Sequence, residues 1–178
     1  MEKKLKHIFI ICGKARSGKN EVSNYLEKIL KNTVSLSITK SLKDYAMLIS
    51  DWDGREETKP RTLLQTLGID IIQKQIDDHF LIKRILQDIE VLSFYKENIF
   101  ITGVRLEEEI RSIQENYPNT IVLKVVRPNF DNKLTEKEKE HITENDLNTY
   151  KPDYEIINDG NILELQNKLD KVVEEIYE

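Results

Sequence analysis

The chain has 178 residues, of which 39% are hydrophobic and 33% charged, and its formal net charge is −5. The length and the hydrophobic fraction predict one domain over residues 1–178 with an ordinary core. The negative net charge argues against a dedicated nucleic-acid-binding protein. No apolar run approaches ~20 residues, which argues against a membrane protein. The single cysteine, Cys12, excludes an internal disulfide bond and favours a cytoplasmic location.

Strand-like apolar runs recur along the chain. Residues 7–12 are continuously apolar and β-rich, which is typical of a strand buried on both faces of a parallel sheet. Further strands are predicted at 33–38, 98–102, 120–126 and 154–157.

Helical periodicity fills the intervals between these runs. A helix is predicted after the first strand, a charged helix at 107–114, and a final amphipathic helix from 162 to 176. Residues 41–95 are also predicted to be helical, with breaks near 51–54 and at Gly68. Strands alternating with helices predict an α/β fold with a parallel sheet of about five strands, whose ligands bind at the carboxyl ends of the strands.

A glycine-containing loop follows the first predicted strand. It matches the phosphate-binding pattern G-x-x-x-x-G-K-[ST] at every place but the last and comprises Gly13, Lys14, Ala15, Arg16, Ser17, Gly18, Lys19 and Asn20. Backbone N–H groups of such a loop turn around a phosphate, and the start of the next helix adds donors and partial positive charge. We therefore expect ATP with Mg²⁺ to bind here, with Lys19 on the outer phosphates. Asn20 stands where a hydroxyl would hold Mg²⁺, so we expect phosphates and water to provide most of the metal's ligands.

This loop is similar to that of the phage and bacterial deoxynucleoside monophosphate kinases, which have Asp or Asn after the lysine, and the animal-type phosphomevalonate kinases are similar at the loop. Other segments resemble the same family in the same order: 41–43, 61–70, 101–105, 127–128, 141–144 and 158–160. The resemblance covers about residues 6–177. It implies a P-loop NTPase three-layer sandwich with a helical acceptor-binding insert at about 41–92 and a small lid at about 128–150.

The resemblance also implies roles for individual residues. Lys19, Arg105 and Arg127 would be catalytic, by neutralising charge on the transferred phosphoryl group. The acceptor would be bound by Lys43, Arg61, Gln65 and Arg105. The lid would carry Lys133, Lys137, Lys139, His141 and Glu144.

The residues themselves leave other interpretations open. Arg61 and Gln65 are four apart and share a helix face, which could equally be a solvated polar face. Arg105 follows a buried strand and could clamp phosphate oxygens, or it could pair with an acid among Glu107–Glu109. Lys43 could be merely solvated, and Glu144 could cap a short helix.

The function predicted is ATP-dependent phosphoryl transfer to a (deoxy)nucleoside monophosphate, giving the diphosphate, by a cytoplasmic enzyme that is a monomer or homodimer. Its partners would be ATP and a small phosphorylated acceptor, with no role for nucleic acid or membrane. Two alternatives remain. One is a kinase of another phosphorylated metabolite such as phosphomevalonate. The other is a non-catalytic nucleotide-binding regulator, which Asn20, the glycine at 103 in place of the family's aspartate, and a lid without arginine would favour.

Overall fold

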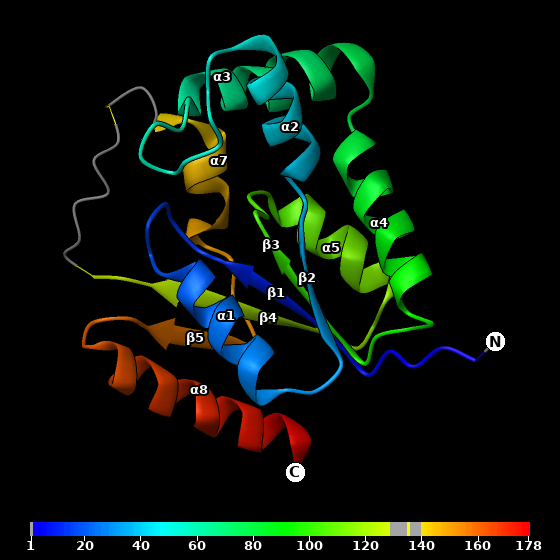
Figure 1. Cartoon of the computed structure of the whole chain (residues 1–178), viewed down its shortest axis with the longest axis vertical. Coiled ribbons are helices and arrows are strands. Elements are labelled where there is room, and N and C mark those ends of the chain that lie inside the picture. The colour runs from blue at the N-terminus through cyan, green and yellow to red at the C-terminus, as the bar shows by residue number, and fades with distance from the viewer. Residues whose placement is uncertain (1, 129–134, 136–139) are drawn as a thin grey trace.

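The computed structural model describes residues 2–128, 135 and 140–178. Its centre is a five-stranded, all-parallel sheet in the order β2-β3-β1-β4-β5 (Figure 1). The strands are β1 (His7–Cys12), β2 (Thr33–Ser37), β3 (Asn98–Thr102), β4 (Thr120–Val126) and β5 (Tyr154–Ile157). The α/β class and the parallel sheet of five strands are therefore confirmed.

The middle strand β1 explains why the sheet sits between two helical layers. It pairs with β3 on one side and β4 on the other, and Ile8 to Cys12 are fully buried. Because side chains alternate along a strand, Ile8, Ile10 and Cys12 enter one core and Phe9 and Ile11 the other. Cys12 is thus a buried strand residue, as predicted.

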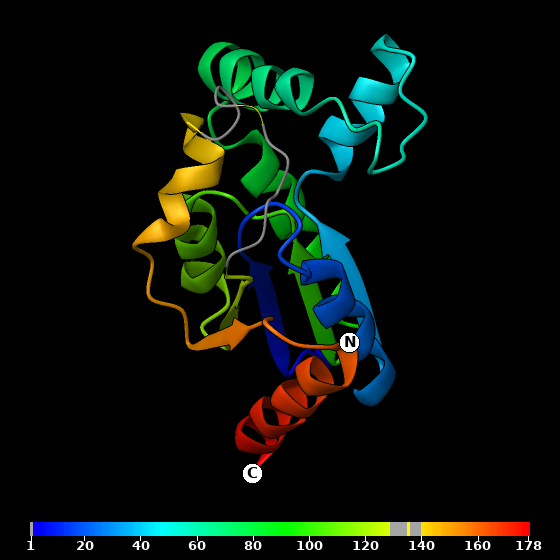
Figure 2. The ribbon, with the colours of Figure 1, turned by 90° about the vertical axis from the view of Figure 1, so that its left-hand side faces the viewer.

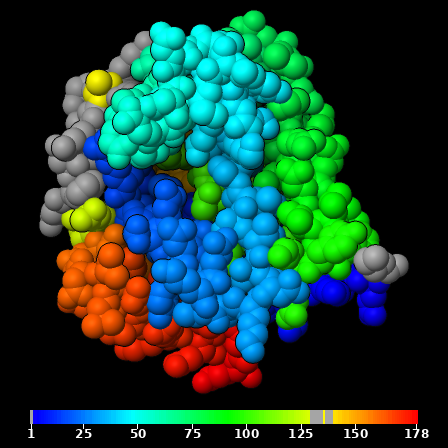
Figure 3. Space-filling view, in the orientation of Figure 1, coloured from blue at the N-terminus to red at the C-terminus, as the bar shows by residue number. Residues whose placement is uncertain are grey.

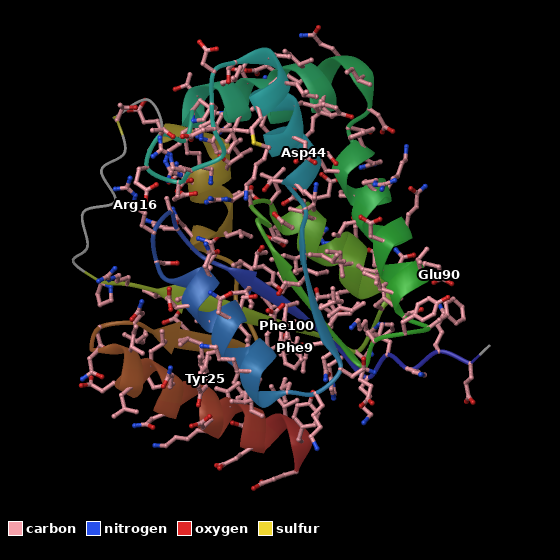
Figure 4. All side chains as sticks on the ribbon, viewed as in Figure 1. Phe9, Arg16, Tyr25, Asp44, Glu90 and Phe100 are labelled. Carbon is pink, nitrogen blue, oxygen red and sulfur yellow. The ribbon has the colours of Figure 1, made fainter. Side chains whose placement is uncertain are left out.

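Each core is closed by a pair of helices. One face is covered by α1 (Lys19–Ile29) and α8 (Ile162–Tyr177), and the other by α4 (Phe80–Leu92) and α5 (Glu107–Asn116) (Figure 1). Under α1 and α8, the rings of Phe9 and Phe100 lie beside each other with centroids 5.2 Å apart (Figure 4). Tyr25 of α1 donates to Asp170 of α8 at 2.7 Å. The three-layer sandwich is confirmed.

A helical insert between β2 and β3 overhangs the carboxyl ends of the strands. It begins with α2 (Lys40–Ile49), continues through a loop at 50–60, and then forms α3 (Arg61–Gln65) and the π-helical segment η1 (Thr66–Ile76) before α4. In Figure 2 it lies above the loop that follows β1.

The predicted helix break at Gly68 is wrong. Gly68 is buried inside the continuous α3–η1 run, where an added Cβ would lie 3.1 Å from Leu42 Cδ1. Packing against α2 therefore outweighs the roughly 1 kcal/mol helix penalty of glycine. The chain instead leaves the helix at Asp77, whose extended φ of −159° ends η1.

A short segment of the predicted lid is also described. It consists of α7 (Ile142–Asn145) and η2 (Asp146–Asn148), and it stands beside the insert at the strand ends (Figure 2). Its lower end is fixed by Lys124 of β4, whose Nζ donates to the carbonyls of Leu147, Asn148 and Tyr150 at 2.7, 3.2 and 3.3 Å. In the described parts of the chain, no helix combines the length and the apolar character needed to cross a membrane.

Candidate active site

The loop between β1 and α1 has the backbone conformation that its glycines predict. Gly13 and Gly18 have φ of +134° and +107°, in the region that side chains disfavour, and Arg16 has φ of +60°. A Cβ on Gly18 would lie 2.5 Å from Asn158 Nδ2, whose amide donates to Ser17 O at 2.8 Å. No side chain caps the N-terminus of α1 at Gly18. The first N–H groups of the helix are therefore free of a side-chain cap and can donate hydrogen bonds to a bound anion.

Lys19 is held over this loop rather than pointing into solvent. Its Nζ donates to the carbonyls of Gly13 at 2.9 Å and Lys14 at 2.7 Å. Burial lowers the pKa of Lys19 to about 7, the positive charge of Arg105 acts in the same direction, and the Glu144 carboxylate opposes both. The ammonium is therefore at a place where a bound polyphosphate would strongly favour its charged form.

Arg105 lies just beyond β3 and is fixed by two carboxylates. Its Nη1 pairs with Glu144 Oε1 at 2.9 Å, and its backbone N–H donates to Glu109 Oε2 at 2.7 Å. Glu109 also accepts from Leu106 N–H, and burial raises its pKa against these hydrogen bonds. The expected alternative, a pairing of the Arg105 guanidinium with an acid at 107–109, is wrong, because the guanidinium pairs with Glu144 of the predicted lid.

Glu144 links the lid to the loop. Its side chain is only 9% exposed, and its Oε2 accepts from the backbone N–H of Ala15 at 3.4 Å while Oε1 holds Arg105. The capping role considered for it belongs instead to His141, whose side chain accepts from Thr143 N–H at the start of α7. The Glu144 carboxylate thus occupies a position between a loop amide and a guanidinium, two groups suited to a phosphate oxygen.

The insert, the loop and the strand ends enclose a cavity of about 320 Å³, visible as a hollow in Figure 3. Of the predicted acceptor-binding residues, Lys43, Arg61, Gln65 and Arg105 all line it. Arg16, at the loop in Figure 4, also lines it, as do Gly18, Lys19 and Asn20. Gln65 Nε2 lies 3.5 Å from Thr143 Oγ1, so the insert reaches across to the lid.

Lys59 is a cavity residue that sequence reasoning did not single out. Lys59 precedes α3 with a side chain only 15% exposed, and it pairs with Glu56 at 3.2 Å. Arg61 pairs with the same carboxylate at 2.7 Å. The sequence offered only the sign of Lys59's charge, within a polar stretch that resembles an ordinary surface loop.

A second cavity, of about 440 Å³, adjoins the first on the β4 side of the loop. Gly13, Lys14 and Ser17 line it together with Lys124 and the exposed Arg127. Arg105 and Glu144 border both cavities, so their ion pair stands between them. Ser17 Oγ is buried without a hydrogen-bond partner among the described residues. Lys133, Lys137 and Lys139 of the predicted lid lie outside the residues that the structure describes.

The donor set shows how Mg²⁺ would fit. Across residues 2–128, 135 and 140–178, no group of three or more His, Cys, Asp or Glu side chains is placed to hold a metal ion. Gly103 has φ of +82°, and a Cβ there would lie 2.8 Å from Thr39 Oγ1 and 3.1 Å from Ser37 Oγ. These two hydroxyls line the main cavity and occupy the space that an aspartate at 103 would need. The residues fit a metal held mainly by ATP phosphates and water, with Asn20 and the two hydroxyls as the neutral oxygens nearby.

A phosphate-binding loop after β1 of a β2-β3-β1-β4-β5 sheet, facing a helical insert, defines a P-loop kinase fold. Solved structures with this fold cover the chain almost end to end. An unliganded sugar kinase from a Janibacter species gives a TM-score of 0.59 at 10% identity, covering 96% of this chain and 95% of that one. Dephospho-CoA kinase from Campylobacter jejuni gives 0.52 at 16% identity, covering 95% and 96%. Shikimate kinase from Acinetobacter baumannii gives 0.53 at 13% identity, covering 98% and 94%. At these identities the likeness concerns the fold alone.

The family follows from the sequence of the insert, lid and C-terminal half. Residues 46–169 match the family described as deoxynucleotide monophosphate kinase, and the chain belongs to this family. It is therefore a kinase-like phosphotransferase, as predicted. A search of curated proteins gives no significant match. The loop at 13–20 lies outside the matched residues, so its phosphate-binding pattern is an independent observation.

Proposed function

We propose that the protein transfers the terminal phosphoryl group of ATP to a (deoxy)nucleoside monophosphate, giving the diphosphate. One observation carries this proposal above all: the phosphate-binding loop opens into a cavity to which the insert contributes a wall with Lys43, Lys59 and Arg61. A donor phosphate on the loop and an acceptor phosphate on that wall would face each other across Arg105. Membership of the family supports the acceptor class.

In this proposal the protein aligns the two phosphates and neutralises charge. Lys19 and the amides of the loop hold the outer phosphates of ATP, and Mg²⁺ bound with ATP would supply further positive charge to neutralise them. Arg105, held by Glu109 on its backbone, can turn its guanidinium from Glu144 to the transferring group. Arg127 lies at the end of β4 on the donor side. No general base is needed, because a phosphate monoester acceptor is already anionic at neutral pH.

Acceptor recognition is assigned to the insert. Arg61 would bind the acceptor phosphate, and Gln65, one turn further along, would read the base through its amide. Both side chains line the cavity, and Gln65 is near Thr143 of α7. The insert and α7 can then exclude water, which would otherwise accept the phosphoryl group.

A non-catalytic nucleotide-binding regulator is the second candidate, and Gly103 favours it. The family resemblance implies an aspartate at the end of β3 that would help to bind the metal ion, and here two hydroxyls fill its space.

The test is to incubate the protein with ATP, Mg²⁺ and each ribo- and deoxyribonucleoside monophosphate, with phosphomevalonate as a further acceptor, and to resolve the products by chromatography. Diphosphate formation that Lys19→Ala abolishes supports the proposed kinase. Transfer to phosphomevalonate alone replaces the acceptor class. ATP binding without transfer to any acceptor supports the regulator.

A further inference from the structure

The loop that leads into α3 presents buried cations to the main cavity. Lys59 and Arg61 lie on either side of Pro60, and their side chains are only 15% and 13% exposed. Lysine and arginine are rarely buried this far unless paired. Both line the cavity of about 320 Å³, on the side that the insert contributes.

The conformation of this loop is fixed by its own hydrogen bonds. Trp52 is half-buried, and its Nε1 donates to the carbonyl of Arg55 at 2.9 Å. Thr58 Oγ1 donates to Asp53 Oδ1 at 2.9 Å. Lys59 is therefore held at the cavity by a closed turn.

The cations share one counter-ion. Glu56 pairs with Arg61 at 2.7 Å and with Lys59 at 3.2 Å, and its own side chain is 53% exposed. Burial raises the pKa of Glu56, but the charges of Lys59 and Arg61 and their hydrogen bonds outweigh burial, so the pKa lies below its ordinary value. Burial lowers the pKa of Lys59; Glu56 opposes this, and Lys43 and Arg61 add to it. Three cations and one carboxylate leave an excess of positive charge on this wall.

We propose that Lys59 binds the phosphate of the acceptor together with Arg61, and that Glu56 is the internal counter-ion which this phosphate displaces. The inference rests on the proposed function, and it adds a residue that family resemblance did not supply. A phosphate monoester carries close to two negative charges and three acceptor oxygens. It can satisfy the ammonium and the guanidinium together, and the half-exposed Glu56 carboxylate can move into solvent when it is released.

A purely structural ion pair would have the opposite signature. In that case Glu56 would hold Lys59 in place, and loss of either partner would weaken the insert and acceptor binding alike. In our proposal the two residues act against each other: Lys59 attracts the acceptor, and Glu56 competes with it. The signs of the two substitutions therefore separate the interpretations.

The experiment compares wild type with Lys59→Met, Glu56→Gln and the control Lys74→Met. Lys74 lies in the same insert and pairs with Asp70, but it is 65% exposed and does not line the cavity. The Michaelis constants for the monophosphate and for ATP are measured for each. We expect Lys59→Met to raise the acceptor KM about 10- to 100-fold, as for loss of a charge-assisted hydrogen bond. Its KM for ATP should stay within about twofold, Glu56→Gln should lower the acceptor KM, and Lys74→Met should change neither constant.

A binding measurement covers the case in which no acceptor is phosphorylated. With the loop saturated by Mg·ADP, inorganic phosphate is titrated and thermal stabilisation is followed. We expect wild type and Lys74→Met to be stabilised, Lys59→Met to lose the response, and Glu56→Gln to respond at lower phosphate. The inference is overturned if phosphate stabilises Lys59→Met as much as Lys74→Met. It is also overturned if Glu56→Gln, like Lys59→Met, responds to phosphate more weakly than wild type. Failure of wild type to phosphorylate any monophosphate, with these phosphate responses intact, overturns the proposed function alone.

Discussion

The lowered pKa of Lys19 predicts that ATP binding weakens as the pH rises above 7. In the ligand-free protein this pKa is about 7, against an ordinary value near 10.4. A bound polyphosphate favours the ammonium form, so above pH 7 binding must take up a proton. By linkage, the dissociation constant then rises with pH until the pKa of the complex is reached.

The magnitude follows from the fraction of Lys19 that is already charged. With a pKa of about 7, this fraction falls from roughly 9% at pH 8.0 to roughly 0.3% at pH 9.5. The dissociation constant of Mg·ATP should therefore rise about 30-fold over this interval. The terminal phosphate is fully ionised throughout, because its second pKa is near 6. Burial raises the pKa of nearby Cys12 to about 11, which places it outside the interval.

Isothermal titration calorimetry at pH 8.0, 8.5, 9.0 and 9.5 measures this dependence, and buffers of different ionisation enthalpy count the protons taken up. We expect uptake of about 0.9 proton per ATP at pH 8.0. Lys19→Arg keeps a permanent charge and should bind with a nearly constant affinity over the same range. Glu144→Gln removes a charge that raises the pKa of Lys19, so its loss of affinity should begin at lower pH. A wild-type dissociation constant that changes less than threefold, or the same slope in Lys19→Arg, refutes the reasoning.

Three further predictions concern stability. The unfolded chain binds the Lys19 proton more tightly than the folded chain. The free energy of unfolding without ligand should therefore rise by about 2 kcal/mol from pH 7 to pH 9 in urea titrations, and Lys19→Met should lack this rise. Gly103→Asp should lower the free energy of unfolding by about 1–3 kcal/mol, since its φ is +82° and Thr39 blocks its Cβ; an unchanged urea midpoint would contradict this. Lys124→Met should speed amide hydrogen exchange across residues 142–150, because three carbonyls lose their donor, and exchange like that of wild type would show that the ammonium does not hold the lid.

The strands were predictable because each encodes its environment locally. Residues 8–12 are apolar throughout, and burial on both faces requires this of a central parallel strand. The helical insert was less predictable from the sequence. Glycine at 68 suggested a break, but its missing side chain serves contact with Leu42, a residue far along the chain. The real end of η1 lies at Asp77, which carries no strong helix-stop signal.

The candidate site divides in the same way. The backbone conformation of the loop at 13–18 could be predicted, because the phosphate-binding pattern places its two glycines at a fixed spacing within one short segment. The pairing of Arg105 with Glu144 joins residues 39 apart, and the contact of Glu144 with Ala15 joins residues 129 apart. Such contacts depend on how the lid folds onto the strand ends, which no local spacing encodes. Lys59 was missed because its burial is created by the turn that Trp52 helps to close.

These pairings also explain how an acidic chain can be equipped for anions. Its net charge of −5 gives no general attraction for ATP or a monophosphate. The site instead concentrates cations and holds acids against them: Glu144 against Arg105, and Glu56 against Lys59 and Arg61. A cluster of buried cations without counter-ions would be costly to fold. In our proposal, carboxylates neutralise the cations before substrates bind, and phosphates neutralise them afterwards. On this reasoning the substrates are selected less by charge than by the ability of a phosphate to satisfy more donors than the carboxylate it replaces.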